Sequence, residues 1–157
     1  MLIWMRGEPR ENEARAPMTP NGAADMVAKG WRVVVEDAAD RCIPTASYRD
    51  VGCEIVENGS WVDAPDDAII LGLKELPEDG TPLRHRHIMF GHAFKGQASG
   101  RILLDRFKVG GGTLLDLEYL VDETGRRVAA FGYWAGFAGA ALSVPARAEL
   151  VPMPAFA

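Results

Sequence analysis

The sequence has few cysteines, no long apolar run and no excess of basic charge. Cys42 and Cys53 match no zinc or CxxC spacing, so free thiols in a reducing compartment are expected. No apolar stretch approaches the roughly 20 residues of a membrane span, and the short apolar start of the chain is unlike a secretory signal. A net charge of −5 gives no basic footprint for nucleic acid. We therefore expect a cytoplasmic protein that binds neither membrane nor nucleic acid.

Several motifs that would reveal a cofactor or a metal are also missing. No GxGxxG, Walker or GxSxG pattern occurs, and Gly110–Gly112 leads into a predicted strand rather than out of one. The three histidines form no HExxH pattern. The sequence therefore predicts no metal site and shows no dinucleotide-binding unit of its own.

The remaining pattern is an alternation of strand-like and helix-like segments in a chain of 157 residues, long enough for one domain with a substantial core. This alternation predicts an α/β domain with a mostly parallel sheet. The expected strands are residues 2–5, 31–36, 53–56, 68–73, 87–93, 113–120 and 127–131, and the expected helices are 19–30, 47–51, 97–107 and 133–142. Prolines at 145, 152 and 154 predict a loose tail over 143–157.

Two ionisable residues each close an apolar run. Lys74 follows the run 68–73, and His92 follows the run 88–91. The carboxyl ends of parallel strands open onto the crevice where ligands bind, and lysine and histidine are readily tuned for proton transfer. We predict that both face one crevice with their nitrogens within about 12 Å, together with Arg15, which follows the first strand. The alternative is a solvated lysine beside a core histidine bonded to a backbone carbonyl.

Longer motifs resemble known families. Residues 6–8 and 13–20 resemble the opening of the alanine dehydrogenase and transhydrogenase superfamily. Residues 59–61, 69–78, 85–97, 112–120 and 125–132 resemble the lysine-forming, NAD-dependent saccharopine dehydrogenase family within it. The resemblance covers about residues 2–142.

In that family two Rossmann-like domains face one another, with substrate and NAD between them. The resemblance implies that residues 1–142 form a three-layer, Rossmann-like N-terminal domain that carries substrate-binding and catalytic groups. It implies oxidation of saccharopine with NAD and water to lysine, 2-oxoglutarate and NADH. Arginine suits a substrate carboxylate because its fork is planar and permanently charged.

The resemblance also implies a role for each matching residue. Lys74 and His92 would be the acid–base pair. Substrate would be held by Arg15, Lys74, Gln97 and Phe131. The acid–base pair would be tuned electrostatically by Glu75 and Glu118, and NAD would be contacted by Arg126.

Members of the family are more than twice as long as this chain. The irregular tail 143–157 stands where their cofactor-binding domain is expected, as in a truncated or frame-shifted product or a fragment. We therefore expect a chain that is incomplete and inactive alone, and that self-associates or takes a separate cofactor-domain partner. The alternatives are another amino-acid dehydrogenase of the superfamily, or a non-catalytic binding module derived from it.

Overall fold

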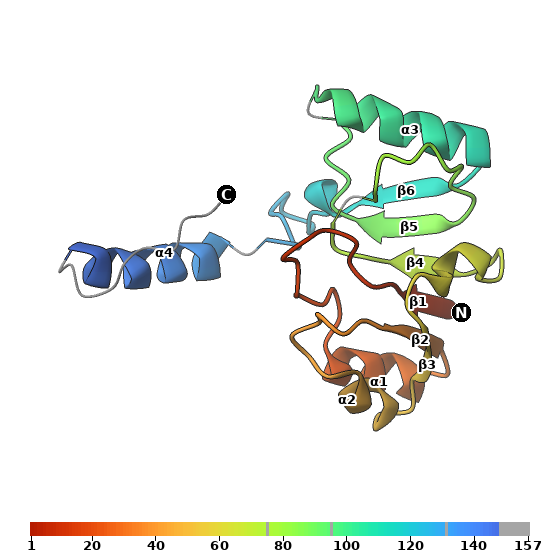
Figure 1. Ribbon diagram of the computed structural model, residues 1–157, viewed down its shortest axis with the longest axis horizontal. Helices are drawn as coiled ribbons and strands as arrows, with labels where there is room; N and C mark the ends of the chain where they lie inside the picture. The colour runs from red at the N-terminus through yellow and green to blue at the C-terminus, as the bar shows by residue number, and fades with distance from the viewer. Residues whose placement is uncertain (75, 95, 131, 148–157) are drawn as a thin grey trace. The chain divides into compact units, whose positions relative to one another are not determined.

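Six parallel strands form one sheet (Figure 1). The computed structural model describes residues 1–74, 76–94, 96–130 and 132–147. They fall into two units, one ending at Tyr119 and one beginning at Leu120, and each is described by itself. The sheet lies in the first unit and consists of β1 (Leu2–Met5), β2 (Arg32–Asp37), β3 (Glu54–Glu57), β4 (Ile69–Leu71), β5 (Arg86–Met89) and β6 (Thr113–Asp116).

The strand order β3-β2-β1-β4-β5-β6 places β1 and β4 at the centre. All four residues of β1 are buried, as are Val33–Val35 of β2, because both strands are covered on both faces. All five strand pairings are parallel. The expected α/β fold with its parallel sheet is confirmed.

Helices cover both faces of the sheet. Helices α1 (Pro20–Ala28) and α2 (Thr45–Arg49) pack against the face that carries Met5, Val33 and Val35. The opposite face carries Trp4, Val34 and Ile70; it is covered by the 3-10 turn η1 (Ser60–Asp63) and helix α3 (Ala98–Gly110). The expected three layers are confirmed, and Figure 1 shows α1 and α2 beside β2 and β3, with α3 beside β6.

The predicted helix starts and ends follow local chemistry. The Thr19 hydroxyl caps α1 by accepting a hydrogen bond from the Gly22 N–H at 3.2 Å. Helix α3 ends at Gly111, whose φ of +75° is the left-handed conformation that glycine adopts most readily. No helix in the described part of the chain is long and apolar enough to cross a membrane.

Two predictions for the second half of the chain are wrong. The strand expected over 113–120 stops at Asp116, because its carboxylate accepts the Glu118 N–H and turns the chain into the 3-10 turn η2 (Leu117–Tyr119). The strand expected over 127–131 is only an isolated bridge between Val121 and Arg127. The Asp122 carboxylate there accepts backbone N–H groups of Thr124 and Arg126, which closes a local turn instead.

The predicted end of the last helix at Leu142 is also wrong. Helix α4 runs from Gly132 to Arg147, so the first part of the expected loose tail is helical. The φ of proline, fixed at about −65°, is also a helical value, so Pro145 continues the helix although it lacks an N–H. Residues 148–157 of the tail lie outside the described residues.

Glu36 joins three parts of the first unit, although it lies at the end of a hydrophobic strand and is fully buried. Its Oε1 accepts hydrogen bonds from the Trp4 indole at 3.2 Å and the Trp61 backbone at 2.7 Å. Its Oε2 accepts from the backbone N–H groups of Gly7 at 2.8 Å and Gly59 at 2.9 Å. A buried carboxylate is tolerated when its lone pairs are satisfied in this way.

His87 is the other buried ionisable group of note. It lies between the rings of Trp61 and Phe107, both 5.3 Å away, and neither ring nitrogen has a partner among the described residues. Burial, reinforced by the positive charges of Arg6, His85 and Arg106, lowers the pKa of His87 to about 3. His87 is therefore neutral in the folded protein at ordinary pH.

We expect Glu36→Gln to lower the free energy of unfolding by about 2–4 kcal/mol, because its amide NH2 would face two backbone donors. The matched control is Glu54→Gln, which removes the exposed ion pair with Arg32 and is expected to cost less than about 1 kcal/mol. Urea denaturation measures both. Equal stability of the two variants would contradict the role of Glu36.

The buried His87 predicts a pH dependence. Its folded pKa lies below the unfolded value of 6.5, so its contribution to stability is complete above about pH 6.5 and is lost as pH falls towards 3. Between pH 7 and 4 the free energy of unfolding should fall by about 3 kcal/mol more in the wild type than in His87→Phe. Both proteins carry the same carboxylates, so their other titrations cancel. Parallel stability curves would refute this expectation.

Candidate active site at the carboxyl edge of the sheet

The chain reverses its direction of travel across the sheet between β1 and β4. From β1 it moves outward through β2 and β3, then returns to pair β4 with the other side of β1. In open parallel sheets, ligands bind beyond the carboxyl ends of the strands at such a switch point. The segments that follow β1, β4 and β5 therefore form the candidate site.

Lys74 and His92 follow neighbouring strands, as predicted. Beyond β4 and β5, the Gly72 N–H donates to the Ile88 carbonyl at 2.9 Å and the Phe90 N–H to the Leu73 carbonyl at 3.1 Å. The parallel ladder therefore continues up to the two ionisable residues. Their side-chain separation stays a prediction.

Arg6 and Glu8 surround the backbone of Lys74. The Glu8 carboxylate accepts hydrogen bonds from the N–H groups of Leu73 at 2.7 Å and Lys74 at 2.8 Å. The Arg6 guanidinium donates to the Lys74 carbonyl and pairs with Glu8 at 3.4 Å. The end of β1 thus holds the first residues after β4.

Arg15 lies in the loop that follows β1, and its place in one crevice with Lys74 and His92 stays a prediction. Its guanidinium makes a bidentate pair with Glu13, with Nε–Oε1 2.7 Å and Nη2–Oε2 2.5 Å. This hydrogen bond lowers the pKa of Glu13, and the charge of Lys74 adds to the effect. Glu13 therefore lies within electrostatic reach of both cations. Arg15 and Glu13 line one cavity together with Arg6 and Glu8.

His92 is held in an unusual conformation. Its φ of +49° is rare for a residue with a side chain, and such conformations cluster at functional sites. Its Nδ1 lies 3.6 Å from Glu118 Oε1, and its side chain is 26% exposed. The Asp116 carboxylate fixes both partners by accepting the N–H groups of Gly91 and Glu118. His92 is therefore not a core histidine, and it lies beside Glu118, whose implied role in tuning the acid–base pair stays a prediction.

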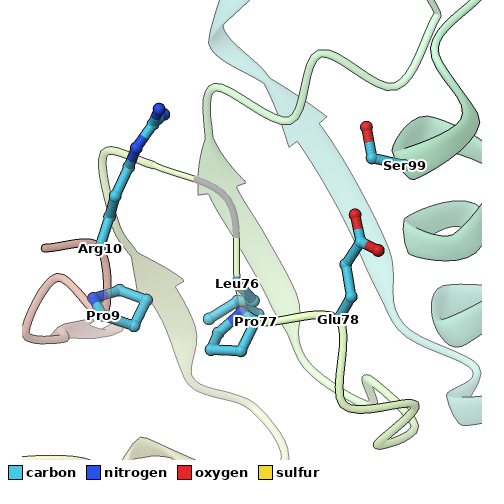
Figure 2. Close-up of a pocket in the computed structure, with 6 residues that line it drawn as sticks. All are labelled: Pro9, Arg10, Leu76, Pro77, Glu78 and Ser99. Atoms are coloured by element: carbon cyan, nitrogen blue, oxygen red, sulfur yellow. The ribbon is translucent and has the colours of Figure 1, made fainter. Parts of the chain in front are cut away.

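A cavity of about 340 Å³ opens along the same edge. Figure 2 shows its lining: Pro9 and Arg10 from the loop after β1, Leu76–Glu78 from the segment after β4, and Ser99 from α3. The lining combines two charged side chains, Arg10 and Glu78, with the apolar side chains of Pro9, Leu76 and Pro77. Its lining suits a small ligand that carries both charged and aliphatic parts.

The remaining predicted site residues are Gln97, Arg126, Glu75 and Phe131. Gln97 is exposed and is the N-cap of α3, just beyond the loop that contains His92. Arg126 is exposed in the second unit and holds the Asp122 turn through its backbone. Glu75 and Phe131 lie outside the described residues.

Sequence patterns alone assigned no role to Arg6, Glu8, Glu13 or Glu36. Arg6, Glu8 and Glu36 are buried, and their partners are backbone groups far away in the chain. An acidic residue that directly follows a β-branched run was the available signal for Glu36. Nothing comparable distinguishes Glu8 from the surface carboxylates around it.

The donor set favours organic ions over a metal. In the described part of the chain, no three His, Cys, Asp or Glu residues are grouped so that they could hold a metal ion. The segments after the strands instead carry basic and acidic side chains: Arg15, Glu13, Lys74, His92 and Glu118. Such a set can bind carboxylate and ammonium groups and exchange protons with them.

Comparisons with known proteins identify relatives of this chain. The chain is 52% identical over 143 residues to saccharopine dehydrogenase [NAD(+), L-lysine-forming] of Emericella nidulans and 49% identical over 142 residues to that of Yarrowia lipolytica. Each match covers 90% of this chain and 38% of the relative. The chain thus spans well under half the length of these relatives.

A solved structure and a family model define the fold relationship. An L-alanine dehydrogenase structure superposes with a TM-score of 0.64 over 79% of this chain and 34% of its own, at 19% identity. This likeness concerns the fold. The family model for the alanine dehydrogenase/PNT N-terminal domain matches residues 4–138. The chain belongs to the alanine dehydrogenase/PNT N-terminal domain family.

Proposed function

We propose that this chain forms the substrate-binding and acid–base part of an NAD-dependent, lysine-forming saccharopine dehydrogenase. The observation that supports the proposal is that Lys74 follows β4 at the β1–β4 switch point and His92 follows the neighbouring strand β5, while Arg15 lies in the loop after β1. The names of the relatives supply the substrate.

The reaction needs several proton transfers. When bound, NAD would supply the hydride acceptor for the carbon that bears the secondary amine of saccharopine, and oxidation of that carbon gives an imine. Water adds to the resulting imine, and the carbinolamine collapses to lysine and 2-oxoglutarate. Lys74 and His92 suit these steps because two groups with different environments can give and take protons. Glu118 lies beside His92, with 3.6 Å between Oε1 and Nδ1, which supports its proposed electrostatic role.

Saccharopine carries three carboxylates that need cationic partners. Arg15 is half exposed, so sharing its guanidinium between Glu13 and a substrate carboxylate costs little. In this proposal Gln97 and Phe131 complete the substrate contacts, and Glu75 tunes the pair together with Glu118. Lys74 is the substrate-contacting cation nearest the switch point.

Binding of NAD requires a pyrophosphate-binding unit that this sequence lacks. The sequence has no GxGxxG turn between a strand and a helix, which is the unit that places a pyrophosphate at a helix N-terminus. Arg126 would add one contact, and a further domain or a partner chain would hold most of the cofactor. We also propose a cytoplasmic location. Self-association is part of the proposal too, because α4 exposes the apolar side chains of Tyr133, Trp134 and Phe137.

Ligand binding tests the substrate assignment. We expect calorimetry to detect saccharopine binding to the chain, and Arg15→Gln and Lys74→Met each to weaken it at least about tenfold, as loss of a charge-assisted contact should. Arg32→Gln is the matched control, because Arg32 also pairs with a glutamate but lies at the start of β2. Binding of pyruvate in preference to saccharopine would instead favour another amino-acid dehydrogenase.

We expect the isolated chain to fold but not to oxidise saccharopine with NAD. Hydride transfer needs substrate and cofactor at near-attack separation, and the groups described at this edge do not cradle a pyrophosphate. NADH absorbance at saturating substrate measures turnover, with a full-length relative as positive control. Turnover equal to that control, and abolished by Lys74→Met, would show that the chain is a complete enzyme.

A further inference from the structure

We infer that Arg6 and Glu8 are positioning residues that fix the direction of Lys74. The inference rests on the proposed role of Lys74 in the reaction. It assigns to the Arg6-Gly7-Glu8 segment, at the end of β1, the task of holding the lysine that follows β4.

Arg6 and Glu8 both form hydrogen bonds with the backbone of Lys74. Glu8 accepts the N–H of Lys74 at 2.8 Å, and Arg6 donates to the carbonyl of the same lysine. A second bond from the Leu73 N–H to Glu8, at 2.7 Å, prevents rotation of the peptide before it. Both polar groups of the Lys74 backbone are therefore bound by charged side chains from the neighbouring strand.

The pair is built for rigidity. The Arg6 side chain is 1% exposed and the Glu8 side chain 5%, so solvent does not compete for these bonds. Arg6 also donates to the Gly7 carbonyl at 3.0 Å. A Cβ atom at Gly72 would overlap the Arg6 guanidinium, so glycine is required there for the arginine to pass. Hydrogen bonds to charged groups are stronger than neutral ones and hold geometry better.

The position of the pair favours function over stability alone. Glu36, on β2, already ties the end of β1 to β2 and η1 through four bonds. Arg6 and Glu8 instead cross the β1–β4 switch point, where the ligand crevice lies. Their bonds end on Lys74, whose charge reaches Glu13. A small rotation of this backbone would move the ammonium group by ångströms.

Nuclear magnetic resonance of the wild-type chain tests the contact directly. We expect through-hydrogen-bond couplings from the amide nitrogens of Leu73 and Lys74 to the Glu8 carboxylate carbon, with slow exchange of both amide protons. Rapid exchange without such couplings would overturn the inference, and this result needs no variant that has to fold.

Variants test the effect on the side chain. The sequence contains four lysines, so the 13Cε signal of Lys74 is assigned by its loss in Lys74→Met. We expect Glu8→Gln to move this signal while Glu54→Gln, an exposed carboxylate, leaves it in place. Glu8→Asp keeps the charge but is too short to reach both N–H groups, and it serves if Glu8→Gln does not fold. An unmoved signal in the folded variant would overturn the inference.

A double-mutant cycle separates positioning from general stability. Glu8→Gln should weaken saccharopine binding about tenfold in the wild-type background and less than twofold in Lys74→Met. Equal weakening in both backgrounds would show that Glu8 acts only on the fold. If the wild-type chain binds no saccharopine, the proposed substrate is wrong, and the couplings and the 13Cε signal still decide whether Glu8 orients Lys74.

Discussion

The parallel pairing of β1 with β4 is the constraint on which the rest of this structure depends. It joins segments almost 70 residues apart and turns the ends of β1, β4 and β5 towards one edge. The segments after β1 and β4 leave the sheet at this point and line the cavities along its edge. Ligands of open parallel sheets bind at such a point, while the strands beneath it are largely buried.

Charged residues serve two different purposes on this scaffold. Glu36, Arg6 and Arg106 are almost fully buried and are bound to backbone groups: Arg106, for example, holds the loop before β5 through the carbonyls of Pro77 and Thr81. Arg15 and His92 are partly exposed and pair with Glu13 and Glu118. The buried set stabilises the loops, and the exposed set carries the proposed chemistry.

Periodicity and local chemistry predicted most elements of the first unit, because β-branched runs, an N-cap threonine and a terminal glycine act within a few residues. Prediction was wrong where side chains redirected the backbone: Asp116 ended β6 early, and Asp122 closed a turn where a strand was expected. It was wrong again at Pro145, where the local rule against proline in helices predicted a loose tail although the helix continues to Arg147.

The sequence by itself determined the α/β class, the strand ends that carry Lys74 and His92, and the resemblance that the family match confirms. Only the tertiary structure decided which strands are neighbours, that Glu8 and Arg6 bind the backbone of Lys74, and that Glu36 collects four donors. The reason is physical. Hydrophobic periodicity is a property of adjacent residues, whereas a buried ion is stabilised by partners that only folding brings within hydrogen-bond distance.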